Sequence, residues 1–332
     1  MSKPLAGLVG RMERHQVVIY LLAMVAGAGI GLAAPGLGSS LEHAINPVLG
    51  ALLYVTFLQV PVADLARSLR DARFLSAAVV INFVIVPLVV AAMFFLLPTD
   101  QAIRVGVLLV LLCPCVDYVI VFSRLAGGSS DRLLAATPVL LIAQMALLPV
   151  FLLLFMGSDL AEVVEVGPFL EAFLILIVIP LILAWTTQAW ASRSAAGRNA
   201  STAASTLMVP LMVAVLGIVV ASQIPTINDN LTDVAAVIPF YIAFLIVMAF
   251  AGKVLASVFG LDVGGSRAIV FSGATRNSLV VLPLALALPD GLELAAAVVV
   301  TQTLVEVIGM VIYVRLTPRL VPSAEPIPTG ST

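Results

Sequence analysis

The sequence predicts an all-α membrane protein whose ten transmembrane helices form two five-helix repeats of opposite orientation. Three observations predict this fold: an apolar composition, ten apolar runs of helix length, and a one-sided distribution of Lys and Arg. Hydrophobic residues make up 62% of the 332-residue chain and charged residues only 10%. Soluble domains are about 45–50% apolar and about 25% charged. So few charges could not cover the surface of a soluble protein, and we therefore expect much of this chain to face lipid.

Each of the ten runs approaches the length of about 20 residues that a membrane-spanning helix needs. They are 17–34, 45–63, 74–97, 103–124, 132–156, 168–190, 206–224, 234–258, 266–288 and 292–316. The runs are apolar throughout instead of alternating with polar residues, which favours helices over barrel strands. The first run has no small-residue cleavage site at its end, so we expect a retained helix and not a signal peptide.

Lys and Arg lie almost entirely on one side of the membrane if all ten runs span it. The fourteen cations on that side are Lys3, Arg11, Arg14, Arg67, Arg70, Arg73, Arg124, Arg132, Arg193, Arg198, Lys253, Arg267, Arg315 and Arg319. The opposite loops contain Arg104, and the sixteenth cation, Arg276, falls inside the ninth run. Lys and Arg are enriched in cytoplasmic loops. Both termini are therefore expected to be cytoplasmic, and the protein is expected in the inner membrane.

The two halves of the chain have the same spacing of runs. Runs two to five begin near 45, 74, 103 and 132, and runs seven to ten begin near 206, 234, 266 and 292. Because five spans is an odd number, residues 161–320 should be inverted relative to residues 1–160, with 321–332 as a cytoplasmic tail. Inverted repeats of this kind are common in secondary transporters, whose substrate site lies near the middle of the bilayer.

Two polar segments interrupt the fourth and ninth runs at corresponding positions, 113–117 and 273–277. Pro114 removes a helical N–H donor, and Gly273 weakens a helix through its conformational freedom. Opened helix ends expose backbone donors and acceptors, which suits the capture of a polar or ionic solute at membrane depth.

Ionisable residues inside the predicted spans are the candidates for function. Asp117 and Arg276 either serve transport or form a buried pair that fixes the two interrupted helices, and both roles are compatible. Glu306 and Gln302 share one face of the tenth run. Glu306 is either a proton carrier or a carboxyl group that is hydrogen-bonded to a neighbouring helix or to Arg276.

The remaining candidates are polar or sulfur-containing. Cys113 and Cys115 are either soft metalloid ligands or small apolar fillers. The candidate substrate-binding residues are Cys113, Cys115, Asp117, Thr275, Arg276, Asn277 and Ser278. The candidate coupling residues are Asn82, Asp117, Arg276, Gln302 and Glu306. We expect no cofactor and no metal site, apart from metalloid binding at Cys115.

Four stretches resemble the bile acid/arsenite/riboflavin transporter superfamily, most closely its arsenite-efflux permeases. They are 81–87, 115–122, 271–277 and 304–307. The resemblance implies that helices 4 and 9 cross within a core of helices 3–5 and 8–10, beside a panel of helices 1, 2, 6 and 7. It also implies functional roles for Cys115 and Glu306, which match a Cys and a Glu of the permeases.

This sequence differs from those relatives at three positions. Leu279 stands where arsenite permeases have a Glu, and Ser272 stands where sodium–bile acid relatives have one. Arg276 stands where the sodium-driven relatives have a Gln. A fixed guanidinium at this place could substitute for a sodium ion, which favours proton over sodium coupling.

The sequence thus predicts a secondary transporter and not an enzyme, with proton-coupled efflux of arsenite or a related small oxyanion as the leading function. The first alternative is uptake or exchange of an organic anion such as a bile-acid-like carboxylate, possibly sodium-coupled. The second alternative is a channel or a solute sensor. The expected partners are a small anionic or metalloid solute, a proton and the lipid bilayer, with no nucleic acid.

Overall fold

The computed structural model describes residues 12, 15–59, 71–115, 118–157, 171, 174–289 and 291–323. Within these residues every extended regular element is a helix, and one isolated β-bridge joins Pro114 to Arg276. The all-α class expected from the apolar runs is therefore confirmed for the described part of the chain.

The helices follow the apolar runs of the sequence. The first half contains α2 (Gln16–Ala33), η1 (Pro35–Leu37), α3 (Gly38–Leu58), α5 (Ala72–Val80), η2 (Ile81–Ile85), α6 (Val86–Phe94), α7 (Gln101–Leu111), α8 (Tyr118–Leu125) and α9 (Ser130–Met156). The second half contains η3 (Leu174–Val178), α12 (Ile179–Arg193), α13 (Ala195–Ser205), α14 (Met208–Asp229), α15 (Leu231–Val258), α16 (Val263–Ala274), α17 (Ser278–Leu286) and α18 (Leu294–Leu320). The segments η2 and η3 are five-residue π-helical turns.

Several helices are long and apolar enough to cross a membrane, so this is a multi-pass membrane protein. Five such segments are Ala72–Phe94, Ser130–Met156, Ala195–Asp229, Leu231–Val258 and Leu294–Leu320. Shorter apolar helices cover Val18–Ala33, His43–Leu58 and Gln101–Leu111. The fourth and ninth predicted runs do not give full-length helices, because each is divided into two shorter ones: α7 and α8, and α16 and α17.

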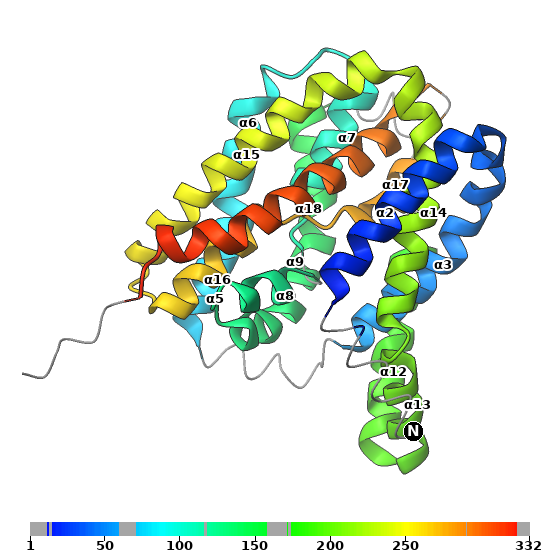
Figure 1. Ribbon diagram of the computed structural model, residues 1–332. Coiled ribbons are helices and arrows are strands. Elements are labelled where there is room, and N and C mark those ends of the chain that lie inside the picture. The colour runs from blue at the N-terminus through cyan, green and yellow to red at the C-terminus, as the bar shows by residue number, and fades with distance from the viewer. Residues whose placement is uncertain are drawn as a thin grey trace, which may run out of the picture.

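The described helices pack in two groups that lie side by side in Figure 1. In the first group, which we call the α14 group, α14 packs against α2 and α3, and α3 packs against α12. In the second, the α18 group, α18 packs against α7, α15 and α17, while α15 packs against α16. Contacts between α14 and α18 join the two groups.

Small residues bring α2 and α14 close together inside the first group. A Cβ atom at Gly27 would lie 2.6 Å from the carbonyl oxygen of Gly217, and one at Gly31 would lie 2.6 Å from that of Ala221. Side chains cannot fit at such distances. Pairs of small residues four positions apart are a common way for membrane helices to approach each other, because apolar side chains gain little by leaving lipid.

Arg132 in α9 ties together the starts of α5 and α16, the two helices that precede Asn82 and Thr275. Asp71 caps α5 and Asp262 caps α16. The guanidinium of Arg132 forms ion pairs with both carboxylates, at 3.1 Å from Asp71. All three side chains are at least 38% exposed, so these pairs fix geometry more than they add stability.

Candidate functional site

The first helix break separates α7 from α8. α7 ends at Leu111 and α8 begins at Tyr118. Pro114 lies between them, and it explains the break because proline lacks an N–H donor and clashes with the preceding helical turn.

The second break separates α16 from α17 without any proline. Thr275 follows Ala274 with extended backbone angles, φ −88° and ψ 140°. Asn277 then caps α17, its side chain accepting a 3.3 Å hydrogen bond from the N–H of Val280. Asn is a favoured capping residue because its side-chain oxygen satisfies an N–H group that the first helical turn leaves unpaired.

The two extended segments lie against each other and run antiparallel. The N–H of Cys115 donates to the carbonyl oxygen of Thr275 at 3.2 Å, and the N–H of Asn277 donates to that of Cys113 at 2.8 Å. Buried backbone groups that have left a helix need other partners. Each break therefore supplies the backbone hydrogen bonds that the other one lacks.

The Arg276 side chain is fully buried beside this bridge and binds the ends of both broken helices. Its Nη1 donates to the carbonyl oxygen of Leu111 at the end of α7, at 3.2 Å. Its Nη2 donates to the carbonyl oxygens of Ser272 and Gly273 near the end of α16, at 2.9 and 2.7 Å. A further bond of 2.9 Å joins Nη2 to the side-chain oxygen of Asn82.

This placement puts a positive charge where two helices end. The last carbonyl groups of a helix have no intrahelical partner and carry the negative end of its dipole. The guanidinium of Arg276 also stacks over the ring of Phe244, 5.5 Å from the ring centre. Its Nε has no hydrogen-bond partner among the described residues. Asp117, the partner that the sequence predicts for Arg276, lies outside them.

Asn82 reaches the break from the π-helical turn η2. Its side-chain Nδ2 donates to the carbonyl oxygen of Ala78 at 2.9 Å and to the hydroxyl of Ser272 at 2.8 Å. With its Oδ1 bound to Arg276, the buried amide makes three hydrogen bonds. π-helical turns recur at functional sites because the extra residue redirects side chains.

Glu306 is buried in α18 on the other side of Arg276. Its carboxylate accepts hydrogen bonds from the hydroxyl of Tyr118 at 2.5 Å, from the backbone N–H of Arg276 at 2.8 Å, and from the side-chain amide of Gln302. The Tyr118 hydroxyl also lies 3.1 Å from the carbonyl oxygen of Arg276. Three donors on one carboxylate offset much of the cost of burying it.

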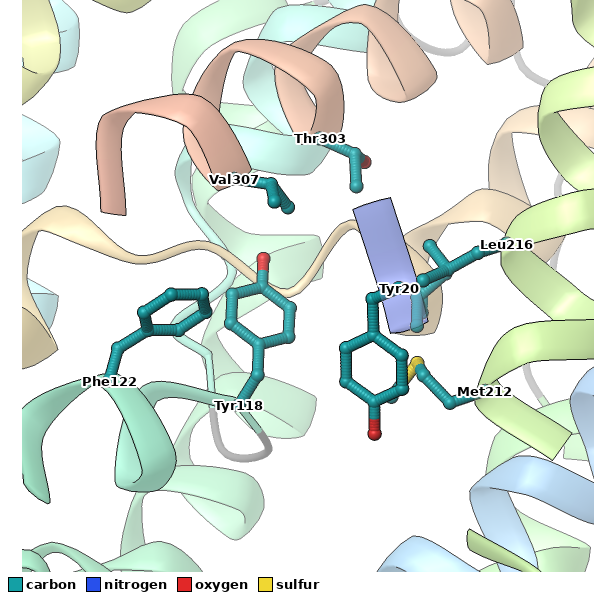
Figure 2. Close-up of a pocket in the computed structure, with 8 residues that line it drawn as sticks. Tyr20, Tyr118, Phe122, Met212, Leu216, Thr303 and Val307 are labelled. Atoms are coloured by element: carbon teal, nitrogen blue, oxygen red, sulfur yellow. The ribbon is translucent and has the colours of Figure 1, made fainter. Parts of the chain in front are cut away.

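A small cavity of about 10 Å³ lies between the α14 group and the α18 group, next to this cluster (Figure 2). That is roughly the room of one water molecule. Its walls are Tyr20, Tyr118, Phe122, Met212, Leu216, Leu279, Thr303 and Val307. Figure 2 shows Tyr118 pointing its hydroxyl toward α18, the helix that carries Thr303 and Val307. The cavity is therefore mostly apolar, with a hydrogen-bonded cluster directly behind one wall.

The beginnings of two half-helices meet at this cavity. Tyr118 is the first residue of α8, and Leu279 is the second residue of α17. A helix N-terminus carries unpaired N–H groups and the positive end of the dipole, so both ends favour an anion. The guanidinium of Arg276 thus lies at the C-termini of α7 and α16, while the first residue of α8 and the second residue of α17 line the cavity.

The chain that forms these two helix breaks is similar to a known protein family. The model of the sodium bile acid symporter family matches residues 46–221, more than half of the chain. The chain belongs to the sodium bile acid symporter family. Members of this family are transporters, so the expectation of a transport protein is supported, as is the resemblance to bile acid transporters drawn from the sequence. The closer likeness to arsenite-efflux permeases stays a prediction. Among curated proteins, none matches the chain significantly.

Most of the residues predicted for the site of this symporter-family protein do lie at or beside the two breaks. The described ones are Asn82, Cys113, Cys115, Thr275, Arg276, Asn277, Ser278, Gln302 and Glu306, and each is at most 2% exposed. Ser278 accepts a 2.7 Å hydrogen bond from Thr303, while Thr275 donates to the carbonyl oxygen of Phe271 at 2.9 Å. None of the nine lines the cavity directly. They form the layer behind it.

Cys113 and Cys115 contribute backbone groups to the bridge. Their side chains are 0% and 1% exposed, and neither is in a disulfide. Both thiols lie within the packed interior and not on the cavity wall.

The two tyrosines of the cavity, Tyr118 and Tyr20, were not identified from the sequence. Tyr118 joins the cavity wall to Glu306, and Tyr20 of α2 faces the same cavity. Tyr118 follows directly after the polar segment 113–117, and this position at the end of a break is a signal that could have identified it. Tyr20 stands in an ordinary apolar run, and nothing in the sequence distinguishes it.

Proposed function

We propose that this protein is a secondary transporter that carries a small organic anion through the cavity between the α14 group and the α18 group. One observation supports this most directly: the cavity is bounded by both helix groups, with two helix N-termini at its edge. In transporters with interrupted helices, such N-termini bind anionic groups of the substrate near the middle of the membrane. Behind the cavity wall, two buried polar atoms have no partners among the described residues: Asn277 Nδ2 and Gln302 Oε1. They leave further capacity for hydrogen bonds if the wall opens during transport.

Transport then requires the two helix groups to move against each other. In our proposal α2, α3, α12 and α14 are the panel, and the helices from α5 to α9 and from α15 to α18 are the core. A cavity with room for about one water molecule corresponds to a closed state, and separation of α14 from α8 and α18 would enlarge it. Such rocking of one bundle against another is the usual form of alternating access.

We further propose the ten-helix inverted repeat, with residues 1–160 and 161–320 as its halves and cytoplasmic termini in an inner membrane. The starts of α8 and α17 differ by 160 positions, and those of α9 and α18 by 164. α9 and α18 both contain 27 residues. Reporter fusions at positions 160, 228 and 290 should read periplasmic, and those at 128, 196 and 325 cytoplasmic. A cytoplasmic result at 228 would contradict the inverted repeat.

The cavity walls favour an organic anion over arsenite. Six of the wall residues are aromatic or large aliphatic side chains from four different helices: Tyr20, Tyr118, Phe122, Met212, Leu216 and Leu279. Apolar walls with a few polar groups suit a solute that has a hydrocarbon body and one charged end. Proton-coupled arsenite efflux, the function favoured by the sequence, remains the second candidate because Cys113 and Cys115 lie within the first break, on either side of Pro114.

We propose proton and not sodium coupling. The guanidinium of Arg276 already holds carbonyl oxygens of α7 and α16 and the side-chain oxygen of Asn82. Oxygen atoms of this kind are the ligands that a hard cation such as sodium requires. A tethered cation would make a mobile one unnecessary at this place, leaving Glu306 as the group that could carry a proton.

Reconstitution of the full chain in liposomes tests the proposal. Labelled taurocholate, short-chain carboxylates and arsenite would each be offered in counterflow, under a pH gradient or a sodium gradient. We expect a carboxylate to accumulate transiently above equilibrium and to respond to the pH gradient alone. Leu216→Trp, which fills the cavity wall, should abolish uptake, while Leu207→Trp at an exposed position should not. Flux without counterflow would indicate a channel, and uptake of arsenite alone would favour the second candidate.

A further inference from the structure

A large groove on the outer face of the molecule lies between α15 and α18, away from the cavity described above. Its volume is about 990 Å³. α15 and α18 run in the same direction along it (Figure 1). Among its lining residues, Ile246, Phe250, Ile308 and Leu316 are 50–60% exposed, so this face is open to the surrounding bilayer.

The groove offers a ligand almost no hydrogen bonds along its length. Of the few polar side chains that line it, Tyr313 donates to the carbonyl oxygen of Leu245, and Thr301 donates to that of Ala297 at 2.8 Å. These hydroxyl protons are therefore already used within the protein. A ligand that fills the groove must be largely hydrocarbon.

One end of the groove is basic and the other is acidic. Arg319 lines the groove near the end of α18, and exposed Arg315 precedes it by one helical turn. Exposed Lys253 lies one turn beyond the lining residue Phe250 on α15. Asp229 and Asp233 stand at the opposite end, beside the lining residue Leu231.

We propose that this groove is a binding site for an anionic phospholipid, with its acyl chains along α15 and α18 and its headgroup at Arg319 and Arg315. Basic groups at the membrane-facing end of a helix pair bind anionic headgroups, while the acidic end repels them. The hydrocarbon walls select a lipid chain over a soluble anion, since a free phosphate would gain nothing from them. This proposal concerns a different surface from the transport cavity and does not depend on the identity of the transported solute.

Native mass spectrometry of the full chain with an equimolar mixture of phosphatidylglycerol and phosphatidylethanolamine tests the site. We expect the anionic lipid to bind preferentially. The double variant Arg315→Gln/Arg319→Gln should lower the ratio of bound phosphatidylglycerol to phosphatidylethanolamine by about fivefold for each arginine removed. The matched variant Arg193→Gln/Arg198→Gln on α12 and α13 should leave that ratio unchanged.

A second pair of variants tests whether the acyl chains of the lipid bind in the groove. Ala249→Trp places a bulky side chain in the groove, whereas Ala243→Trp places one on α15 at an exposed position outside it. We expect only Ala249→Trp to reduce bound lipid. The proposal would be overturned if the wild type bound both lipids equally, or if the two tryptophan variants lost lipid to the same extent. A stable dimer that loses lipid from this face would also overturn it.

Discussion

Arg276 and Asn82 are joined by a 2.9 Å hydrogen bond between Nη2 and Oδ1, although 194 positions separate them. The bond links the break between α16 and α17 to the π-helical turn between α5 and α6. Because Asn82 also binds Ser272, the amide holds both the guanidinium and the helix that precedes it. Arg276 thus serves as a fixed cation whose position is set by two other elements.

Replacing Arg276 with an uncharged residue should make the stability of the protein depend on a bound cation such as sodium. In Arg276→Gln, the carbonyl oxygens of Leu111 and Gly273 and the side-chain oxygen of Asn82 lose their charged donor. A hydrogen bond to a charged group contributes about 1.5–3 kcal/mol, so the loss of several should lower the melting temperature markedly. We expect sodium to restore part of this loss, because the exposed oxygens form a cation site.

Thermal unfolding in sodium chloride and in choline chloride measures this effect. The wild type and the control Arg198→Gln on α13 should melt at the same temperature in both salts. If Arg276→Gln also melts equally in both, the oxygens do not form a cation site when the guanidinium is absent.

A second prediction concerns the close contact between α2 and α14. In Gly31→Ala the new Cβ would meet the carbonyl oxygen of Ala221 at 2.6 Å, so the helices must separate. Overpacking of this kind costs about 1–3 kcal/mol. In Gly29→Ala, on the same helix, the new Cβ meets nothing within 4 Å, and replacing Gly in a helix gains about 0.5–1 kcal/mol.

The two alanine variants should therefore shift the melting temperature in opposite directions. Thermal unfolding in one detergent provides the comparison. Equal shifts in both variants would mean that α2 and α14 do not approach each other at Gly31.

The positions of the two breaks could be predicted from the sequence, whereas the backbone oxygens that bind Arg276 could not. Pro114 weakens a helix locally, and the offset of about 160 residues identifies the corresponding segment near Arg276. The bonds from Arg276 to the backbone of Leu111 and Gly273 depend on how the two halves pack, and backbone acceptors are the same in every residue type. The sequence therefore suggested a carboxylate partner, Asp117, because charge is visible in a sequence and a free carbonyl group is not.

The contact between Tyr118 and Glu306 is the second feature of the site that the sequence did not predict. Tyr118 directly follows the polar segment 113–117, which marks its position, but the sequence does not show what its hydroxyl binds. Its role depends on the approach of α8 to α18, which brings it to Glu306 across 188 positions. The helical periodicity of the sequence contains no information about this pairing.

A third prediction separates the two substrate classes. Both cysteine thiols are buried away from the cavity, so Cys113→Ser and Cys115→Ser should each keep transport of an organic anion within about twofold, as expected for substitutions that touch no solute. Initial rates in liposomes measure this. If the protein confers arsenite resistance, and Cys115→Ser abolishes that resistance while Cys113→Ser keeps it, Cys115 is instead supported as a metalloid ligand.

The last prediction is that Tyr118 and Glu306 act as one unit that connects the cavity to the coupling group. The ring of Tyr118 forms part of the cavity wall, and its hydroxyl donates to the Glu306 carboxylate. Tyr118→Phe keeps the ring and removes the hydroxyl, which leaves a buried carboxylate with one donor fewer. Glu306→Gln keeps the shape of the side chain and removes its charge.

Each single variant should lower stability by about 1–3 kcal/mol, because each leaves a buried polar group without its partner. The double variant should cost less than the sum, with a coupling energy of about 0.5–3 kcal/mol. Thermal unfolding of the four proteins measures this energy, and liposome uptake adds a functional readout. We expect Tyr118→Phe to bind solute but to lose stimulation by a pH gradient, as Glu306→Gln should. If the two effects are additive, or if Tyr118→Phe keeps full stimulation by the gradient, Tyr118 is only a wall of the cavity.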